Sequence, residues 1–231
     1  MYKLTTLFFA ASLFVKSTFG QASIVTQSET KSRQFTPAYS ADWFTFTDDD
    51  NKEWLRMTLT LTEVSSSGWS TDGSQGHWLG VGFGKASMSG ADIVLCTYSH
   101  NTLASNPIVC YDAKSSGTSR PPADAINDVV TVDSSVTVPM FGLLDFSVTF
   151  DRPLSTGDSS GDIELTQGST ISGIWAHGSY SSNLVQSHTT GSSSARDAFE
   201  LNIPSISLGS SGASALFFVS LALLSFVTLL L

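Results

Sequence analysis

Short runs of alternating apolar and polar residues recur through the middle of the chain and constrain its fold more than any other feature. In residues 57–63 the apolar Met57, Leu59 and Leu61 alternate with polar residues, mostly threonine, which is the period of a strand buried on one face. Similar runs, separated by turn-forming clusters, occupy residues 78–83, 93–98, 108–111, 129–132, 144–150, 171–176 and 198–203. Helical periodicity is almost absent, so the pattern predicts an all-β sandwich or barrel.

The composition limits what such a domain can do. The chain has 231 residues, which suits one domain of ordinary size. Asp and Glu number 20 against 11 Lys and Arg, for a net charge of −9. No basic patch is therefore available to neutralise phosphates, which argues against nucleic acid as a partner. The 41% hydrophobic content is too high for a disordered chain.

The first 22 residues have the pattern of a secretory signal peptide. Lys3 precedes an apolar run at 7–15, and small residues follow, with cleavage expected after Gly20 or Ala22. The apolar run is too short to span a bilayer as a mature helix. We therefore expect a secreted chain whose folded domain occupies residues 23–204.

Residues 205–231 have the pattern of a membrane-attachment signal. Small residues precede an uncharged apolar run at 215–231, and no cation follows it. This fits a GPI-attachment signal, with attachment near Ser205 or Ser207. A retained single-pass anchor is the alternative. Either one places the domain on the extracellular face of the plasma membrane.

Two cysteines lie near the ends of neighbouring predicted strands. Cys96 and Cys110 are separated by 13 residues, and a disulfide between them is the default in a secreted domain. Two thiols alone do not make a four-thiolate zinc site. A free reactive thiol is the lesser alternative.

Sequence motifs for catalysis are missing. The glycines of residues 80–84 alternate inside a strand and are not followed by a helix, so they do not form a nucleotide loop. We expect them to let a flat ligand or another backbone lie close to the sheet. No nucleophile elbow occurs, and the histidines lack metal-site spacing. His77 and His100 are expected in surface loops.

Four blocks together resemble the DOMON domain. They are Trp-Leu-Gly-Val-Gly-Phe-Gly at 78–84, Met-Ser-Gly-Ala-Asp-Ile-Val-Leu at 88–95, Phe-Asp-Arg-Pro-Leu-Ser-Thr-Gly-Asp at 150–158 and Ile-Trp-Ala-His-Gly at 174–178. Their order and spacing agree with the family over about 42–203. The resemblance implies an immunoglobulin-like antiparallel β-sandwich. For the cytochrome members of the family it also implies a b-type haem held between a methionine and a histidine.

The resemblance assigns Met88 and His188 as the two ligands of the haem iron. Met88 lies in a Ser- and Gly-rich loop, where a core methionine is unexpected. His188 lies in polar surroundings, in the stretch after the fourth block. The alternatives are a loop methionine that caps the sandwich and a solvated loop histidine. His177, inside the fourth block, is the competing ligand or a residue lining the pocket.

The resemblance also suggests the remaining contacts of the haem. Trp78, Phe83 and Trp175 are expected to form pocket wall or core. Arg152 is a candidate partner for a haem propionate, because a guanidinium matches the geometry of a carboxylate. Arg196 is a weaker candidate, and for it we favour an ordinary solvated arginine.

These expectations give two hypotheses for the function. The first is an extracellular, membrane-anchored haem protein for one-electron transfer, more a non-catalytic carrier than an enzyme. Its partner would be a redox protein or a small reductant such as ascorbate. The second is a haem-free DOMON module that binds a sugar or another small ligand, or that mediates adhesion. We do not expect a hydrolase or an oxygenase, because the sequence lacks the sets of nucleophilic and metal-binding residues that these enzymes require.

Overall fold

The computed structural model describes residues 22–101, 108–140, 142–182, 184–188 and 195–207. The predicted signal peptide and attachment signal therefore lie almost entirely outside the described residues. Within these ranges the regular structure is β-strand. No helix there has the length and hydropathy needed to cross a membrane.

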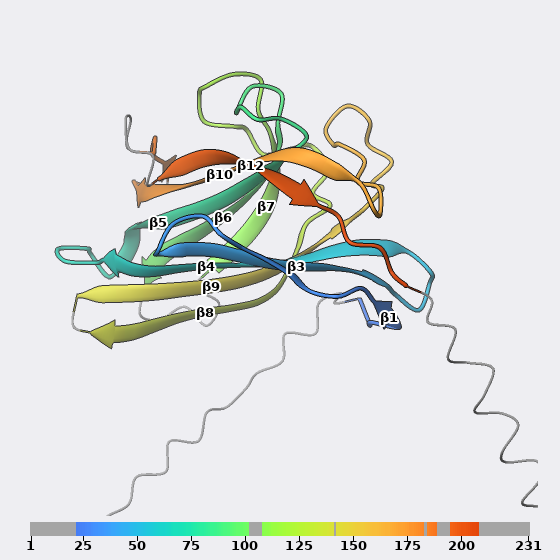
Figure 1. Cartoon of the computed structure of the whole chain (residues 1–231). Coiled ribbons are helices and arrows are strands. Elements are labelled where there is room, and N and C mark those ends of the chain that lie inside the picture. Colours follow the sequence, from blue (N-terminus) through green and yellow to red (C-terminus); the bar gives the residue numbers. More distant parts are fainter. Residues whose placement is uncertain (1–21, 102–107, 141, 183, 189–194, 208–231) are drawn as a thin grey trace, which may run out of the picture.

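Two antiparallel sheets form the layers of the molecule (Figure 1). The first sheet has the order β1-β3-β4-β9-β8, with β2 paired to β3. Its strands are β1 (Thr26–Gln27), β2 (Lys31–Gln34), β3 (Tyr39–Thr47), β4 (Glu53–Ser65), β8 (Val130–Met140) and β9 (Leu143–Pro153).

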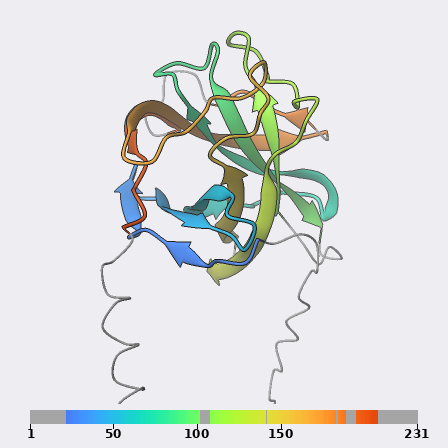
Figure 2. The ribbon, with the colours of Figure 1, turned by 90° about the vertical axis from the view of Figure 1, so that its right-hand side faces the viewer.

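The second sheet has the order β11-β10-β5-β6-β7, with β12 also paired to β10. Its strands are β5 (Asp72–Phe83), β6 (Asp92–Asn101), β7 (Ile108–Lys114), β10 (Thr170–Ser181), β11 (Leu184–Val185) and β12 (Arg196–Asn202). After a quarter turn the strands of both sheets are seen to surround the core (Figure 2). The predicted all-β antiparallel sandwich is confirmed.

The alternation of the sequence determines which side chains enter the core. In β4 the apolar members of the run are completely buried, as Leu59 illustrates at 0% exposure. The intervening threonines face outward, where the Thr58 hydroxyl lies 2.8 Å from that of Thr149 on β9. Each fully buried apolar side chain contributes about 1.5–3 kcal/mol by leaving water. The main core therefore lies between the sheets.

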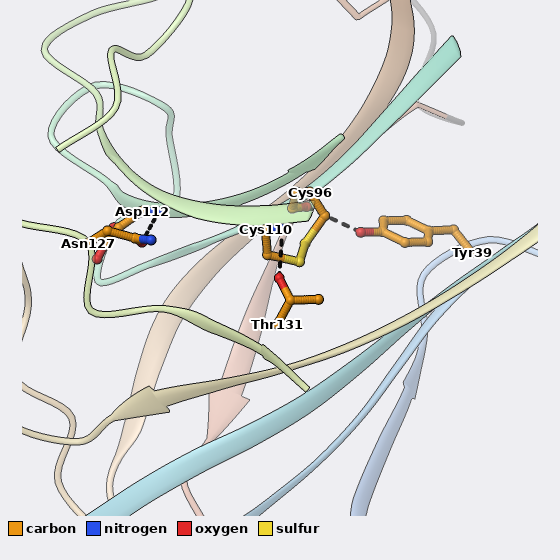
Figure 3. The surroundings of a disulfide bond; sticks show 7 residues. Tyr39, Cys96, Cys110, Asp112, Asn127 and Thr131 are labelled. Carbon is orange, nitrogen blue, oxygen red and sulfur yellow. Dashed lines mark hydrogen bonds between the residues drawn. A yellow bond between two sulfur atoms is a disulfide. The ribbon is translucent and has the colours of Figure 1, made fainter. Parts of the chain in front are cut away.

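The predicted disulfide between Cys96 and Cys110 is confirmed. The two residues are direct cross-strand partners on β6 and β7, and both side chains are buried in the main core. The Thr131 hydroxyl accepts a hydrogen bond from the Cys110 backbone N–H at 2.9 Å, and Tyr39 points toward the bond from the other sheet (Figure 3). A bridge that closes a loop of this length stabilises a domain by about 3 kcal/mol.

The predicted strands are found, but the structure has more strand than the sequence suggested. All eight runs fall on β4–β10 and β12, with differences of one residue at 129 and 203. The turn-forming residues that precede the run at 78–83 belong to strand instead, because β5 begins at Asp72 and its pairing with β6 shifts between Asp72 and Gly76. β3 was not predicted, although its Tyr39, Ala41 and Trp43 alternate into the core.

Candidate functional site

The paired strands β5 and β10 separate their side chains between the two faces of the second sheet. Leu79, Val81 and Phe83 of β5 face the main core, whereas Trp78 faces the other way. A second apolar group, the outer cluster, covers this outward face. It consists of Trp78, Ala91, Ile93, Leu95 and Ala113, with Met88, Tyr111, Ile174, Ala176 and Val185 packed against them.

Met88 lies in the loop that joins β5 to β6, and its side chain packs on the outer cluster. The loop turns back at Gly90, whose φ of +76° favours glycine. The Ala91 backbone N–H donates to the Met88 carbonyl at 3.1 Å. Met88 is half-buried, so this thioether is held against an apolar surface and does not project into solvent.

The segment that carries His188 lies along the same outer cluster. β11 pairs with the end of β10, and Val185 packs on the cluster. The Trp78 indole N–H donates to the Gln186 carbonyl at 2.9 Å. His188 Nε2 then lies 3.3 Å from Nη1 of Arg196, the cross-strand partner of Ala176. The structure thus brings Met88 and His188 to the border of one apolar cluster.

The His188 imidazole is in the form that can bind a metal ion. Burial and, second, the positive charge of Arg196 lower its pKa below the ordinary value, which favours the neutral ring. A guanidinium only donates, so Nε2 accepts and the ring proton is on Nδ1. Nδ1 is buried without a hydrogen-bond partner among the described residues. Among those residues this N–H lacks a hydrogen-bond acceptor, whereas the lone pair that could bind a metal ion is on Nε2.

The glycines of β5 do not leave bare backbone for a ligand, which argues against the ligand half of that expectation; the backbone carbonyl of Val94 lies close to Gly80. A Cβ on Gly82 would come within 2.7 Å of Cγ1 of Ile174, and one on Gly80 within 3.2 Å of Cδ1 of Leu95. Side chains from the neighbouring strands therefore cover the glycines. A flat ligand on this face would contact a layer of aliphatic side chains.

His177 faces the interior, on the opposite side of the sheet from Met88. Its Nδ1 lies 3.1 Å from Nε2 of His77, and its ring stacks on Trp175. His177 and Met88 therefore do not share a site. His77 and His100 are not in surface loops, which corrects that expectation: both lie in strands, and His100 Nδ1 is 2.7 Å from the Tyr98 hydroxyl.

The two interior histidines border a cleft of about 570 Å³ at one end of the sandwich. Trp69 and Glu63 also line it. The Trp69 ring stacks near that of His77, with 6.4 Å between ring centroids. This is a second candidate site, with aromatic and polar groups around one opening.

His77 should make the folding stability depend on pH. Its pKa is lowered to about 3, first by burial and second by the neighbouring His177. An unfolded histidine binds a proton below about pH 6.5. His77 therefore contributes stability that is present above pH 6.5 and is lost as the pH falls toward 3. Between pH 7 and 5, wild type should lose roughly 1–2 kcal/mol more than His77→Phe. Urea unfolding at both pH values measures this difference, and equal losses would contradict it.

The other predicted pocket residues have different locations. Trp78 belongs to the outer cluster, whereas Phe83 and Trp175 belong to the main core. Arg152 is completely buried. Its guanidinium donates to Asp92 at 2.5 Å, and also to the carbonyls of Pro153 and Ile163. Both Nη atoms of Arg152 thus bind groups inside the protein, which argues against its expected role as a propionate partner.

Asp92 is a residue that the sequence reasoning missed. It stands inside the apolar run 91–95, and an aspartate in a buried strand is rare unless it is paired. That position alone predicts a buried cation, which the structure identifies as Arg152.

Residues 69–178 match the DOMON domain family. The chain carries a DOMON domain. The matched range includes β5, β6, β7 and most of β10, and with them Met88 and the outer cluster. The chain matches no curated protein. Among solved structures, the DOMON protein is similar to the cytochrome b domain of pyranose dehydrogenase from Coprinopsis cinerea. The identity is 12% and the TM-score 0.46, over 71% of this chain and 75% of that one.

Proposed function

We propose that this protein is an extracellular, membrane-attached DOMON protein that holds a b-type haem on its outer cluster and transfers single electrons. One observation carries the proposal. Met88 packs on the outer cluster, and His188, 100 residues away in the sequence, follows the segment that contacts this cluster and has a lone pair on Nε2 of its neutral ring.

A bound haem iron with a thioether and an imidazole ligand would supply a one-electron couple, with a potential raised by the thioether. The residues of the chain would prepare this site. The outer cluster excludes water from one face, and burial keeps His188 neutral, as a ligand histidine must be. With Met88 and His188 both holding the iron, electron transfer would be favoured over oxygen chemistry.

Arg196 is the cation that would change its contacts if a haem bound at His188. Only the lone pair on Nε2 of neutral His188 is available, and it now faces the exposed Arg196 guanidinium. Metal ligation at His188 would release that guanidinium at the edge of the cluster. It could then pair with a carboxylate of the ligand, the role first expected of Arg152.

The location of the protein and the nature of its redox partners are part of the same proposal. The signal peptide predicted at 1–22 and the attachment signal predicted at 205–231 would place the domain outside the cell. Its net charge of −9 favours a redox partner with a basic surface. A small reductant such as ascorbate is the other source of electrons.

The first test is an optical spectrum of the purified chain after haem supplementation. We expect a Soret band that shifts on reduction. Met88→Ala should keep the haem but lower its potential by on the order of 100 mV, because the thioether is lost. Spectroelectrochemistry measures this, with the exposed Met140→Ala on β8 as the matched control. An unchanged potential in Met88→Ala would exclude Met88 as a ligand.

The interior cleft supports a second candidate, a haem-free module that binds a small ligand. Its volume of about 570 Å³ and its Trp69 wall suit a sugar-sized molecule. A protein that stays colourless after haem supplementation would favour this function over electron transfer.

A further inference from the structure

Three aspartates meet inside the protein at the end of the main core, two of them on β6 and β7 only four and two residues from the disulfide cysteines. Asp92 begins β6, Asp112 lies on β7, and Asp162 lies in the connection between β9 and β10. Each offers a carboxylate oxygen, and the three oxygens lie within 4.8 Å of one another. We call these residues the aspartate cluster.

The strand period explains why these charges point inward. Asp92 continues the inward row of Val94 and Cys96, and Asp112 continues that of Ile108 and Cys110. Asp112 lies beside Asn127, whose side-chain carbonyl accepts its backbone N–H at 3.0 Å (Figure 3). The backbone of the cluster is therefore fixed by the sheet and by this loop contact.

The carboxylates of the cluster are buried and largely unpartnered. Asp112 is only 1% exposed, yet neither of its carboxylate oxygens has a hydrogen-bond partner. Both oxygens of Asp162 and Oδ1 of Asp92 are also buried without such a bond. Buried carboxylates are normally hydrogen-bonded, paired or bound to a metal. The free lone pairs of Asp112 thus point to a missing ligand.

One arginine does not balance three carboxylates. Arg152 Nη2 lies 2.5 Å from Asp92 Oδ2 and 3.9 Å from Asp162 Oδ1. Nearby Lys114 donates to the Gly161 carbonyl. With all three aspartates ionised, the cluster and Arg152 keep two negative charges in a buried site. Burial and the charges of Asp92 and Asp162 raise the pKa of Asp112 to about 8, which reflects the same imbalance.

We propose that the aspartate cluster is a calcium site. A divalent cation cancels the two excess charges, and an all-oxygen donor set selects a hard cation. Calcium binds oxygens at 2.3–2.6 Å, so two ligands of one ion lie at most about 5 Å apart. The observed limit of 4.8 Å fits that span. Magnesium requires shorter bonds and stricter octahedral geometry.

The site would join the paired strands β6 and β7 to a third segment that the sheet does not connect to them. Asp162 belongs to the connection 154–169, whereas Asp92 and Asp112 belong to neighbouring strands. Asp92 also directly follows the loop of Met88, through the Ala91 N–H that bonds the Met88 carbonyl. Bound calcium therefore braces both this connection and the base of the Met88 loop.

The test uses the purified full chain, freed of metal with a chelator and then titrated with calcium chloride alone. We expect one calcium ion per chain by calorimetry, with a Kd below about 1 mM, as in extracellular calcium modules. At saturation the melting temperature should rise by roughly 5–10 °C. Magnesium chloride at the same concentration should give a much smaller rise.

Asp112→Asn distinguishes a calcium ligand from a merely structural carboxyl group. The metal-free variant should melt at or above the wild-type temperature, because asparagine replaces a carboxyl group whose ionised form is destabilised by burial, yet its calcium shift should be lost. Asp162→Asn should also lose the shift, whereas Asp133→Asn, exposed on β8, should keep it. Wild type without calcium binding, an equal magnesium shift, or an undiminished calcium shift in Asp112→Asn would each overturn the proposal. None of these results depends on haem.

Discussion

Replacing Arg152 with methionine should lower the free energy of unfolding by about 3–5 kcal/mol. The methionine fills a similar volume, but Asp92 Oδ2 loses the guanidinium that now lies 2.5 Å away. The carbonyls of Pro153 and Ile163 also lose their donors. A buried charge without its partner costs more than the pair contributes when intact, which is why the expected loss is large.

Urea unfolding of the metal-free protein measures this loss, with a chelator present so that no cation replaces the missing charge. Adding Asp92→Asn to Arg152→Met should recover part of the stability, because the stranded carboxylate is neutralised. The exposed Arg33→Met on β2 is the matched control and should change stability by less than about 0.5 kcal/mol. A loss below 1 kcal/mol in Arg152→Met would show that the buried ion pair is not formed.

Replacing His188 with alanine should lower the affinity for haem by at least about 100-fold. Partners that only orient a ligand histidine already contribute 10- to 100-fold to metal affinity, and loss of the ligand itself should cost at least as much. His188 follows the segment whose Val185 and Gln186 contact the outer cluster, on which Met88 packs. Titration of the haem-free protein with haem, followed at the Soret band, gives the affinity for haem.

His177→Ala is the matched control for this experiment. His177 lies on the interior face, beside His77, so its loss should leave haem affinity within a few-fold of wild type. Added imidazole should restore haem binding to His188→Ala, because a free ring can enter the space left by the side chain. If His177→Ala loses haem and His188→Ala keeps it, the assignment of the ligand is wrong.

The fold could be predicted from the sequence because the strand period is local. Leu59 and Leu61 alternate with threonines within a few residues, and burial follows directly from that pattern. β3 was missed although Tyr39, Ala41 and Trp43 alternate, since the aromatic Phe44 and the buried polar Thr45 break the period. The placement of Cys96 opposite Cys110 followed from two neighbouring strands and a short connection.

The charged interior could not be predicted as easily, because its partners are distant in the sequence. Arg152 continues the inward row of Phe146, Val148 and Phe150 on β9, so its burial was visible in the period. Its partner Asp92 lies 60 residues away, and only the packed sheets bring the two together. The same holds for His77 and His177, which are 100 residues apart.

β10 presents Ala176 to the outer cluster and the next residue, His177, to the interior cleft. Because side chains along a strand alternate with a period of two, inserting or deleting one residue between Gly173 and Gly178 would exchange these environments. Apolar side chains would then face the cleft, and an imidazole would enter the aliphatic layer. The number of residues in this strand is therefore under tighter constraint than the identity of most of them.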